Sequence, residues 1–287
     1  MELGRVGVWT RELRTGDEGA RRDAAAQLEE LGYGALWFPG GHGDDSMDCA
    51  RIVLDATRRV TVATGITNIW TEPADEVAAK HAELAARYDH RFLLGVGISH
   101  RAPMDRIKEG MYDKPFSAMV AYLDELDAAP EPPPVDERVI AALGPRMLRL
   151  SAERAAGTHP YLSVPDHTRD AREAVGPDKH VAPEQGIVLE TDPVRARELA
   201  RGFVERYLTL PNYFRQWLRY GFTEDDLRDG GSDRLVDALI AWGDEETIAA
   251  RVQEHLDAGA DHVCVQFIHD LDGLPTEQWR RMAEVLL

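Results

Sequence analysis

The sequence is poor in cysteine and short of basic residues. Its two cysteines, Cys49 and Cys264, lie far apart and fit no zinc-binding or redox spacing. Cys264 stands in an apolar run at 263–265, which predicts a thiol buried in a strand. The 33 Lys and Arg against 51 Asp and Glu give a formal charge of −18. Because phosphates and anionic lipids attract basic surfaces, this balance disfavours a nucleic-acid or membrane-surface partner.

Long apolar runs are also missing. No stretch approaches the ~20 apolar residues that a membrane-spanning helix needs. The first five residues lead directly into a strand-like segment and show no signal-peptide pattern. With only two distant cysteines, these absences predict a cytoplasmic protein.

Several familiar motifs are absent too. The first predicted strand ends in Trp9-Thr10-Arg11-Glu12, without the G-x-G-x-x-G turn of a dinucleotide-binding sheet. Gly97-Ile98-Ser99-His100-Arg101 lacks the second glycine of a serine-hydrolase elbow. No His-x-His pair or His/carboxylate cluster has metal-ligand spacing, so we expect no metal. Glu184 follows Pro183 at a strand end, but the fourth strand offers no second carboxylate, which disfavours a retaining glycosidase.

What the chain does contain is an alternation of short β-branched or aromatic runs with longer amphipathic segments. Eight such units in under 300 residues favour an α/β fold, a closed (β/α)8 TIM barrel, over an open parallel sheet. We therefore expect one domain over 1–287. The predicted strands are 5–10, 35–39, 60–70, 92–99, 138–143, 157–162, 180–190 and 262–268. The predicted helices are 16–31, 48–58, 75–88, 115–128, 145–155, 166–175 and 193–220.

Two segments interrupt the alternation. A proline-rich spacer at 129–134 precedes the fifth strand. An insertion at about 202–242 lengthens the connection before the last strand, and long inserts in barrels often act as lids or binding loops. Its aromatic residues favour a core or dimer-contact helix over the roof of a pocket. They are Tyr213, Phe214, Trp217 and Tyr220.

The active site of a barrel forms at the carboxyl ends of its strands, so candidate residues are sought there. After the second strand, Gly40 and Gly41 let a ligand approach the backbone, and His42 is a candidate proton donor. In the third strand, Gly65 indicates a bulge or a close backbone approach. The polar residues that follow it, Thr67 and Asn68, favour a binding role.

The fourth and fifth strands end in glycine-containing segments. Gly95 and Gly97 leave one side of the barrel mouth bare, which suits a flat ring, and the adjoining Ser99-His100 can bond a ring edge or a substrate. After the fifth strand, Gly144-Pro145 presents backbone N–H groups to an anion. The segment 138–172 holds six arginines against three acids, an electropositive island that can focus an anionic ligand.

Together these strand ends resemble the luciferase-like monooxygenase superfamily, in particular its actinobacterial branch of F420 (deazaflavin)-dependent oxidoreductases. The resembling stretches occur in the same order over nearly the whole chain. The resemblance depends on their order and spacing together and not on any single motif. The stretches concerned are 35–39, 63–69, 91–100, 141–148, 157–161 and 258–263.

The resemblance implies a TIM barrel, usually a homodimer, that holds a flavin or deazaflavin at its carboxyl end. In such proteins a non-prolyl cis peptide in the third strand backs the ring, and it would map here to Gly65-Ile66. Gly97-Ile98-Ser99 would line the ring edge, and Gly144 with the N–H groups of Arg146 and Met147 would hold the phosphate. The anionic tail of coenzyme F420 would suit the arginine-rich segment. Sugar-phosphate dehydrogenases of this kind carry Asp-His where this chain has Gly41-His42.

We therefore expect an oxidoreductase that moves a hydride between C5 of coenzyme F420 and a small organic substrate. The protein would supply position and electrostatics. The candidate proton donors are His42 first, then His100 and Glu184. The alternatives are an FMN-dependent monooxygenase that uses oxygen and a barrel that only binds a flavin-like ligand. The expected cofactor contacts are Gly65, Ile66, Thr67, Asn68, Gly97, Ile98, Ser99, Gly144, Pro145, Arg146 and Met147.

Overall fold

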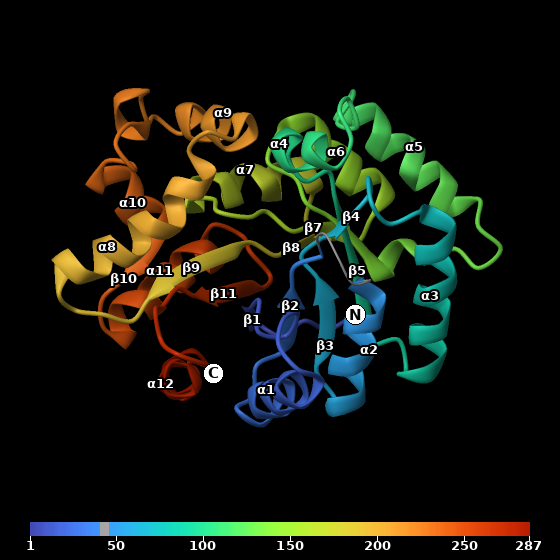
Figure 1. Ribbon diagram of the computed structural model, residues 1–287, viewed down its shortest axis with the longest axis horizontal. Helices are drawn as coiled ribbons and strands as arrows, with labels where there is room; N and C mark the ends of the chain where they lie inside the picture. The colour runs from blue at the N-terminus through green and yellow to red at the C-terminus, as the bar shows by residue number, and fades with distance from the viewer. Residues whose placement is uncertain (41–45) are drawn as a thin grey trace.

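A computed structural model describes residues 1–40 and 46–287 and shows a parallel β-sheet with helices packed around it (Figure 1). The strands pair side by side in chain order from β1 to β8, as the sequence predicts for a barrel. These strands are β1 (Val6–Trp9), β2 (Ala35–Phe38), β3 (Thr61–Thr64), β5 (Phe92–Gly97), β6 (Arg138–Ile140), β7 (Gly157–Thr158) and β8 (His180–Val181).

The sheet closes on itself through the segment that follows β7. Strand β8 pairs with β7, and β9 (Glu184–Val188) pairs with β11 (Val263–Phe267), which in turn pairs with β1. Only Ala182 and Pro183 separate β8 from β9. Ala182 N donates to Thr158 O at 2.9 Å, and Pro183 O accepts from Cys264 N at 3.0 Å. Residues 180–188 therefore bridge β7 and β11, and the predicted TIM barrel is confirmed.

The elements differ from the sequence prediction in places where the backbone is irregular. The predicted third strand is divided into β3 and β4 (Thr67–Asn68), with Gly65-Ile66 between them. The predicted helix 193–220 is wrong: it is divided into α8 (Pro193–Val204) and α9 (Pro211–Arg219), because Pro211 has no N–H to continue a helix and is suited to begin one. A further strand, β10 (Ile240–Trp242), pairs with β9 and is too short to show a sequence period.

The helices lie outside the strands, as Figure 1 shows. None of those in the described part of the chain is long and apolar enough to cross a membrane. Besides α8 and α9 they are α1 (Glu18–Glu30), α2 (Ser46–Ala56), α3 (Ala74–Arg87), α4 (Arg101–Ile107), α5 (Pro115–Asp127), α6 (Pro145–Arg154), α7 (Pro165–Val175), α10 (Asp233–Leu239), α11 (Glu245–Asp257) and α12 (Thr276–Leu286).

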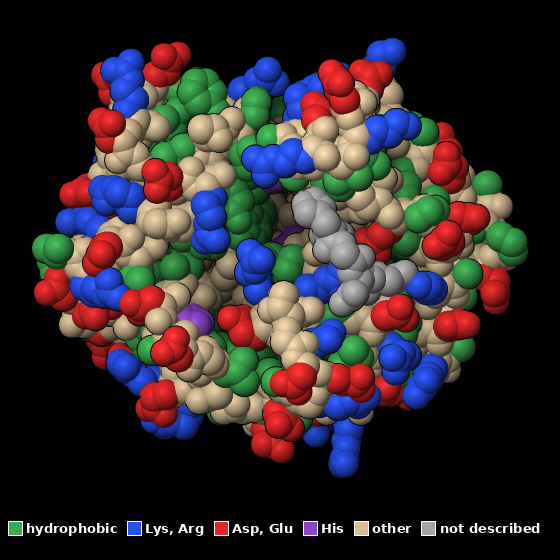
Figure 2. Space-filling view, viewed as in Figure 1, with side chains coloured by type: hydrophobic (Ala, Val, Ile, Leu, Met, Phe, Trp, Pro, Cys, Tyr) green, Lys and Arg blue, Asp and Glu red, His purple; other side chains and the backbone are tan. Residues whose placement is uncertain are grey.

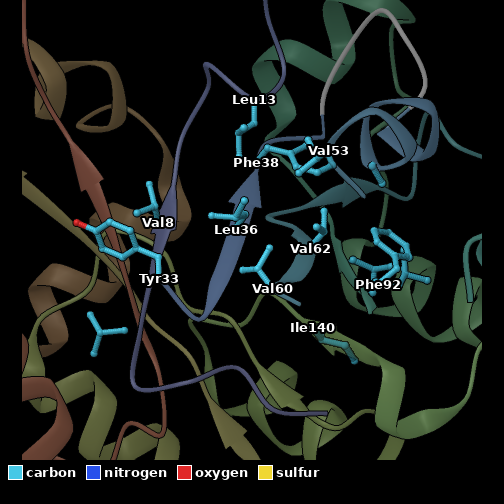
Figure 3. Packing of buried hydrophobic residues seen from close by; sticks show 14 of the residues in the cluster. Val8, Leu13, Tyr33, Leu36, Phe38, Val53, Val60, Val62, Phe92 and Ile140 are labelled. Atoms are coloured by element: carbon cyan, nitrogen blue, oxygen red, sulfur yellow. The ribbon is translucent and has the colours of Figure 1, made fainter. Parts of the chain in front are cut away.

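Alternate residues of the strands face two different cores. Val8, Leu36 and Val62 belong to the apolar layer between sheet and helices (Figure 3). Their neighbours along the strands, such as Trp37 and Ala63, form a second cluster with Cys264. This alternation follows from the period of two along a strand. It places the Cys264 thiol in the barrel core, as the sequence predicts.

A buried carboxylate fixes the start of β3. Glu29, at the end of α1, accepts hydrogen bonds from the amides of Arg58, Arg59 and Val60 at 2.7–3.0 Å. Burial raises the pKa of Glu29, but these amide hydrogen bonds outweigh it and hold the pKa below its ordinary value. The carboxylate therefore stabilises the folded chain in its ionised form.

Replacing Glu29 with alanine is expected to lower the free energy of unfolding by about 2–3 kcal/mol, because it leaves three amides without their charged acceptor. Glu29→Gln keeps an oxygen acceptor and should cost less. A depressed folded-state pKa contributes stability at neutral pH that is lost as the pH falls through the carboxyl range. Urea unfolding at pH 7 and pH 3.5 should thus show that the wild-type protein is more stable than the Glu29→Gln variant and that this difference shrinks in acid. An unchanged difference would contradict this role.

Candidate active site

A cavity of about 520 Å³ opens at the carboxyl ends of the barrel strands. Figure 2 shows a hollow near the centre of the molecule, bordered by hydrophobic side chains and by Lys or Arg side chains. The lining comes from the loops after β1, β2, β3, β5, β6 and β7 and from the insertion. The lining residues are Trp9, Arg11, Arg14, Thr15, Pro39, Gly40, Gly65, Ile66, Asn68, Gly97, Ile98, Ser99, His100, Ala141, Ala142, Leu143, Gly144, Met147, His159, Tyr161, Tyr207, Asn212 and Tyr213.

The break between β3 and β4 forms one wall of this cavity. The peptide bond between Gly65 and Ile66 is cis, as the resemblance implies. Gly65 N donates to Phe38 O at 2.8 Å, and Trp9 Nε1 donates to Gly65 O at 3.1 Å. Ile66 O accepts from Gly40 N at 3.1 Å. Groups from β1 and from the end of β2 thus hold this bend in place.

Small residues from β5 and β6 continue the wall. A Cβ on Gly97 would lie 2.5 Å from Ile66 Cγ1, so the glycine makes room for the Ile66 side chain against the strand end. Next to it lie Ala141 and Ala142, and then Gly144, where a Cβ would meet no protein atom within 4 Å. We call this surface, from Gly65-Ile66 through Gly97 to Gly144, the small-residue wall.

Thr67 and Asn68, both expected at the site, play different parts. Thr67 is buried, and its hydroxyl lies 3.1 Å from Thr64 Oγ1 and 3.0 Å from Ser46 Oγ. It is not among the cavity residues, so its polar group serves the bend. Asn68 lines the cavity, and its Oδ1 accepts from Trp70 N at 3.1 Å.

The turn into α6 engages one of the two backbone amides expected to hold an anion. Gly144 is the N-cap of α6, and Gly144 O accepts from both Met147 N and Leu148 N at 3.0 Å. The Met147 amide, expected to hold a phosphate, is therefore engaged within the turn, whereas the Arg146 amide donates to no backbone oxygen of the described residues. The Arg146 guanidinium stacks over the Phe116 ring at 4.0 Å, and neither Arg146 nor Pro145 lines the cavity.

The electropositive island expected at 138–172 is largely neutralised. Arg138 and Arg154 pair with Asp127, and Arg172 pairs with Asp261. These acids lie outside the arginine-rich stretch of sequence, so a charge count along the chain misses them. Arg169 also pairs, with Asp166 at 2.5 Å. In the described part of the chain, this leaves Arg146 and Arg149 on α6 without an acidic partner.

His100 is the candidate proton donor that the structure brings into the cavity. Its Nδ1 lies 3.2 Å from Oδ1 of Asn212 in α9, so Nδ1 carries the proton and Nε2 bears a lone pair. Nε2 makes no hydrogen bond with any described residue. Burial lowers the pKa of His100, and the bond to Asn212 partly opposes this. His100 is therefore a neutral base at neutral pH.

The other two candidates do not reach the cavity in the structure. His42 lies outside the described residues. Glu184 is fully buried, accepts from Leu162 N at 2.9 Å and is not a cavity residue. Burial raises the pKa of Glu184 to about 8. It is thus a neutral group of the barrel core, and nothing in its contacts gives it access to a ligand.

The sequence interpretation missed a row of aromatic rings that lines another part of the cavity. Trp9 and Tyr161 have ring centroids 5.3 Å apart, and Tyr161 and Tyr207 are 5.8 Å apart. Tyr207 and Tyr213 follow at 5.3 Å, and Tyr213 contacts the His100 ring at 5.4 Å. We call this row, which ends at His100, the aromatic wall. Trp9 is the last residue of β1 and Tyr161 follows β7, so the carboxyl-end rule could have found them.

The insertion contributes both to the core and to the site. The expectation that its aromatic residues belong to a core holds for Trp217, which is fully buried and 5.7 Å from Tyr213. Tyr213 belongs to the same buried cluster and in addition lines the cavity. The two residues differ because α9 presents one side to the barrel mouth. Asn212, the partner of His100, gave no sequence signal at all.

A family model described as luciferase-like monooxygenase matches residues 7–129 and 116–262. No curated protein matches the sequence. Among solved structures, an F420-dependent secondary alcohol dehydrogenase in complex with an F420-acetone adduct superposes with a TM-score of 0.70 at 15% identity, covering 98% of each chain. The coenzyme F420 dependent tetrahydromethanopterin reductase from Methanopyrus kandleri gives 0.75 at 15% identity, covering 100% of this chain and 99% of that one.

The structural neighbours also include a flavin monooxygenase. The oxygenating constituent of 3,6-diketocamphane monooxygenase from Pseudomonas putida, in complex with FMN, gives a TM-score of 0.66 at 15% identity. The match covers 100% of this chain and 96% of that one. At such identity these likenesses show the fold alone.

Proposed function

Because the chain belongs to the luciferase-like monooxygenase family, we propose that it is an F420-dependent oxidoreductase that transfers a hydride between C5 of the deazaflavin and a small organic substrate. The observation that supports this most is the small-residue wall beside the cis Gly65-Ile66 bend. It leaves a flat, apolar face along an open cavity, which suits a planar redox ring. When bound, the coenzyme would supply hydride transfer, the chemistry that the side chains lack.

The residues around the small-residue wall suit both the ring and the phosphate of coenzyme F420. Gly65, Ile66 and Gly97 would contact the ring, while Gly144 and the Arg146 amide would hold the phosphate at the start of α6, where the helix dipole favours an anion. Arg11 lines the cavity and pairs with no acid in the described part of the chain. An unpaired cation at the rim supports coenzyme F420, whose tail is anionic, over FMN.

His100 supplies the proton that must accompany a hydride. His100 lines the cavity, and its Nε2 has no partner among the described residues, so Nε2 can take a proton from a substrate hydroxyl or return one to a carbonyl oxygen. Proton transfer by a positioned histidine requires hydrogen-bond reach of the reacting oxygen, and the cavity lining provides that access.

Titration of the protein with coenzyme F420 and with FMN tests the proposal directly. We expect saturable, tighter binding of coenzyme F420, measured by equilibrium dialysis or by fluorescence of the deazaflavin. Tight binding of FMN alone would overturn the choice and favour the monooxygenase alternative. Exchange of label from reduced, C5-deuterated coenzyme F420 into a substrate would distinguish an enzyme from a barrel that only binds the group.

Gly144→Ala is expected to weaken coenzyme F420 binding by about tenfold, about 1.4 kcal/mol, with only a small loss of stability, because alanine is a poorer N-cap than glycine. Its backbone has ordinary angles, and the added Cβ meets no protein atom, so only a ligand close to the backbone would be obstructed. Gly202→Ala in α8 is the matched control, because its Cβ also meets open space but lies away from the cavity. Normal binding by the Gly144 variant would place the phosphate elsewhere.

A further inference from the structure

We infer that the substrate is a flat, conjugated compound with one hydroxyl or carbonyl oxygen, bound along the aromatic wall with that oxygen between the Tyr213 hydroxyl and the His100 imidazole. This inference rests on the proposed function, since it names the substrate class of the same site. It is carried by the arrangement of polar atoms along the aromatic wall.

The middle of the aromatic wall has no hydrogen-bond donor to spare. Tyr161 OH donates to Gln266 Oε1 at 2.7 Å and lies 3.2 Å from Tyr207 OH. Trp9 Nε1 is already used by Gly65 O. These three side chains therefore offer ring surface to a ligand, and ring surface favours stacked or tilted contact with another planar π-system.

At the end of the aromatic wall that the insertion contributes, one hydrogen-bond donor and one acceptor remain available to a ligand. Tyr213 lines the cavity, and its hydroxyl makes no hydrogen bond with any described residue. Its neighbour His100 offers the lone pair of Nε2, because Asn212 holds the Nδ1 proton. One O–H donor and one nitrogen acceptor, on rings whose centroids lie 5.4 Å apart, match a substrate hydroxyl, which accepts from Tyr213 and donates to His100.

This geometry defines the proton and electron balance of the reaction. In the oxidative direction the carbinol C–H and O–H bonds break and a C=O bond forms. The hydride leaves with its electron pair to the two-electron acceptor that the proposed function supplies, and the hydroxyl proton goes to His100 Nε2. Burial keeps the pKa of Tyr213 well above its ordinary value, so Tyr213 remains a hydrogen-bond donor throughout.

Binding of simple ketones tests the inference without turnover. Protein labelled with ¹⁵N-histidine would be titrated with acetophenone, with its saturated counterpart methyl cyclohexyl ketone, and with ethylbenzene, which lacks the oxygen. The His100 resonances would be followed by NMR and assigned by their loss in His100→Gln. We expect acetophenone to shift them with about tenfold higher affinity than either comparison compound.

Two variants separate the ring contacts from the oxygen contact. Tyr213→Phe keeps the ring and removes the hydroxyl, so it should reduce the preference for acetophenone over ethylbenzene. Tyr207→Leu removes a ring from the middle of the wall and should reduce the preference for acetophenone over methyl cyclohexyl ketone. Circular dichroism and thermal unfolding would show that each variant is folded.

The outcomes distinguish this inference from the proposed function. Equal binding of the aromatic and saturated ketones, with coenzyme F420 still bound by the protein, would overturn the substrate class and leave the oxidoreductase proposal standing. Selective binding of acetophenone by a protein that does not bind coenzyme F420 would overturn the proposed cofactor and support the aromatic wall. A resonance pattern with the proton on Nε2 of His100 would overturn the placement of the oxygen.

Discussion

Replacing His100 with glutamine is expected to lower turnover by about 10²–10⁴-fold, the range associated with a positioned general base. Glutamine can still reach Asn212 and the substrate oxygen, but it cannot carry a proton. Because the proposed cofactor contacts are Gly65, Ile66, Gly97 and the start of α6 and do not include the His100 side chain, the affinity for coenzyme F420 should be unchanged. Single-turnover kinetics and cofactor titration measure the two quantities separately.

The pH dependence gives this prediction a second, independent readout. Burial lowers the pKa of His100, so the base form persists at neutral pH and is lost only below the ordinary histidine range. Alcohol oxidation by the wild-type protein should therefore be flat near pH 7 and fall in acid, and the reverse reduction should rise in acid. The His100→Gln variant should lose this fall of the oxidation rate in acid. If the variant keeps it, a group other than His100 takes up the proton.

Asn212 is expected to act on the reaction through His100. Asn212→Ala removes the acceptor of the Nδ1 proton, which should lower the pKa of His100 further and reduce turnover by less than His100→Gln does. Asn212→Asp would place a carboxylate beside Nδ1 and raise that pKa. If the two variants shift the acid side of the pH–rate profile in opposite directions, Asn212 acts by positioning His100. If both lose activity equally and the profile does not shift along the pH axis, the role of Asn212 is structural.

The sequence predicts the barrel well because the same pattern, a short apolar strand followed by an amphipathic helix, is repeated in every unit. Apolar residues such as Val8, Leu36 and Val62 recur at the same place in successive strands, and the fold follows from their alternation. The carboxyl-end rule then locates Gly97 and Gly144 without a structure, since it needs only the end of each strand.

The sequence does not predict what the fold brings together from distant segments. Arg172 looks like part of a positive island until the fold supplies Asp261, 89 residues away. Asn212 follows Pro211 at a helix start and carries no mark of its link to His100, 112 residues away. The positions of the side chains in the insertion depend on where α9 packs against the barrel. No local sequence pattern predicts that packing.

The two glycines of β5 show the same limit within a single motif. Their spacing predicts two bare positions facing a ring, but only Gly97 lines the cavity. Gly95 is needed for packing against β3, because a Cβ there would lie 1.9 Å from Thr64 O. Its amide and carbonyl also bond Thr64 Oγ1 at 2.9 Å.

Substituting these glycines by alanine should consequently give opposite failures. The Cβ of Gly95→Ala meets a backbone oxygen that cannot move without separating β3 from β5, so we expect a loss of more than about 4 kcal/mol of stability and little folded protein.

The Cβ of Gly97→Ala meets Ile66 at Cγ1 and Cδ1, which can rotate away, so that variant should fold. Its displaced Ile66 side chain would stand out from the small-residue wall and weaken coenzyme F420 binding by at least about tenfold. Thermal unfolding and cofactor titration of the pair test this; a stable Gly95 variant would contradict the packing role, and a Gly97 variant with wild-type affinity would show that the wall does not hold the ring.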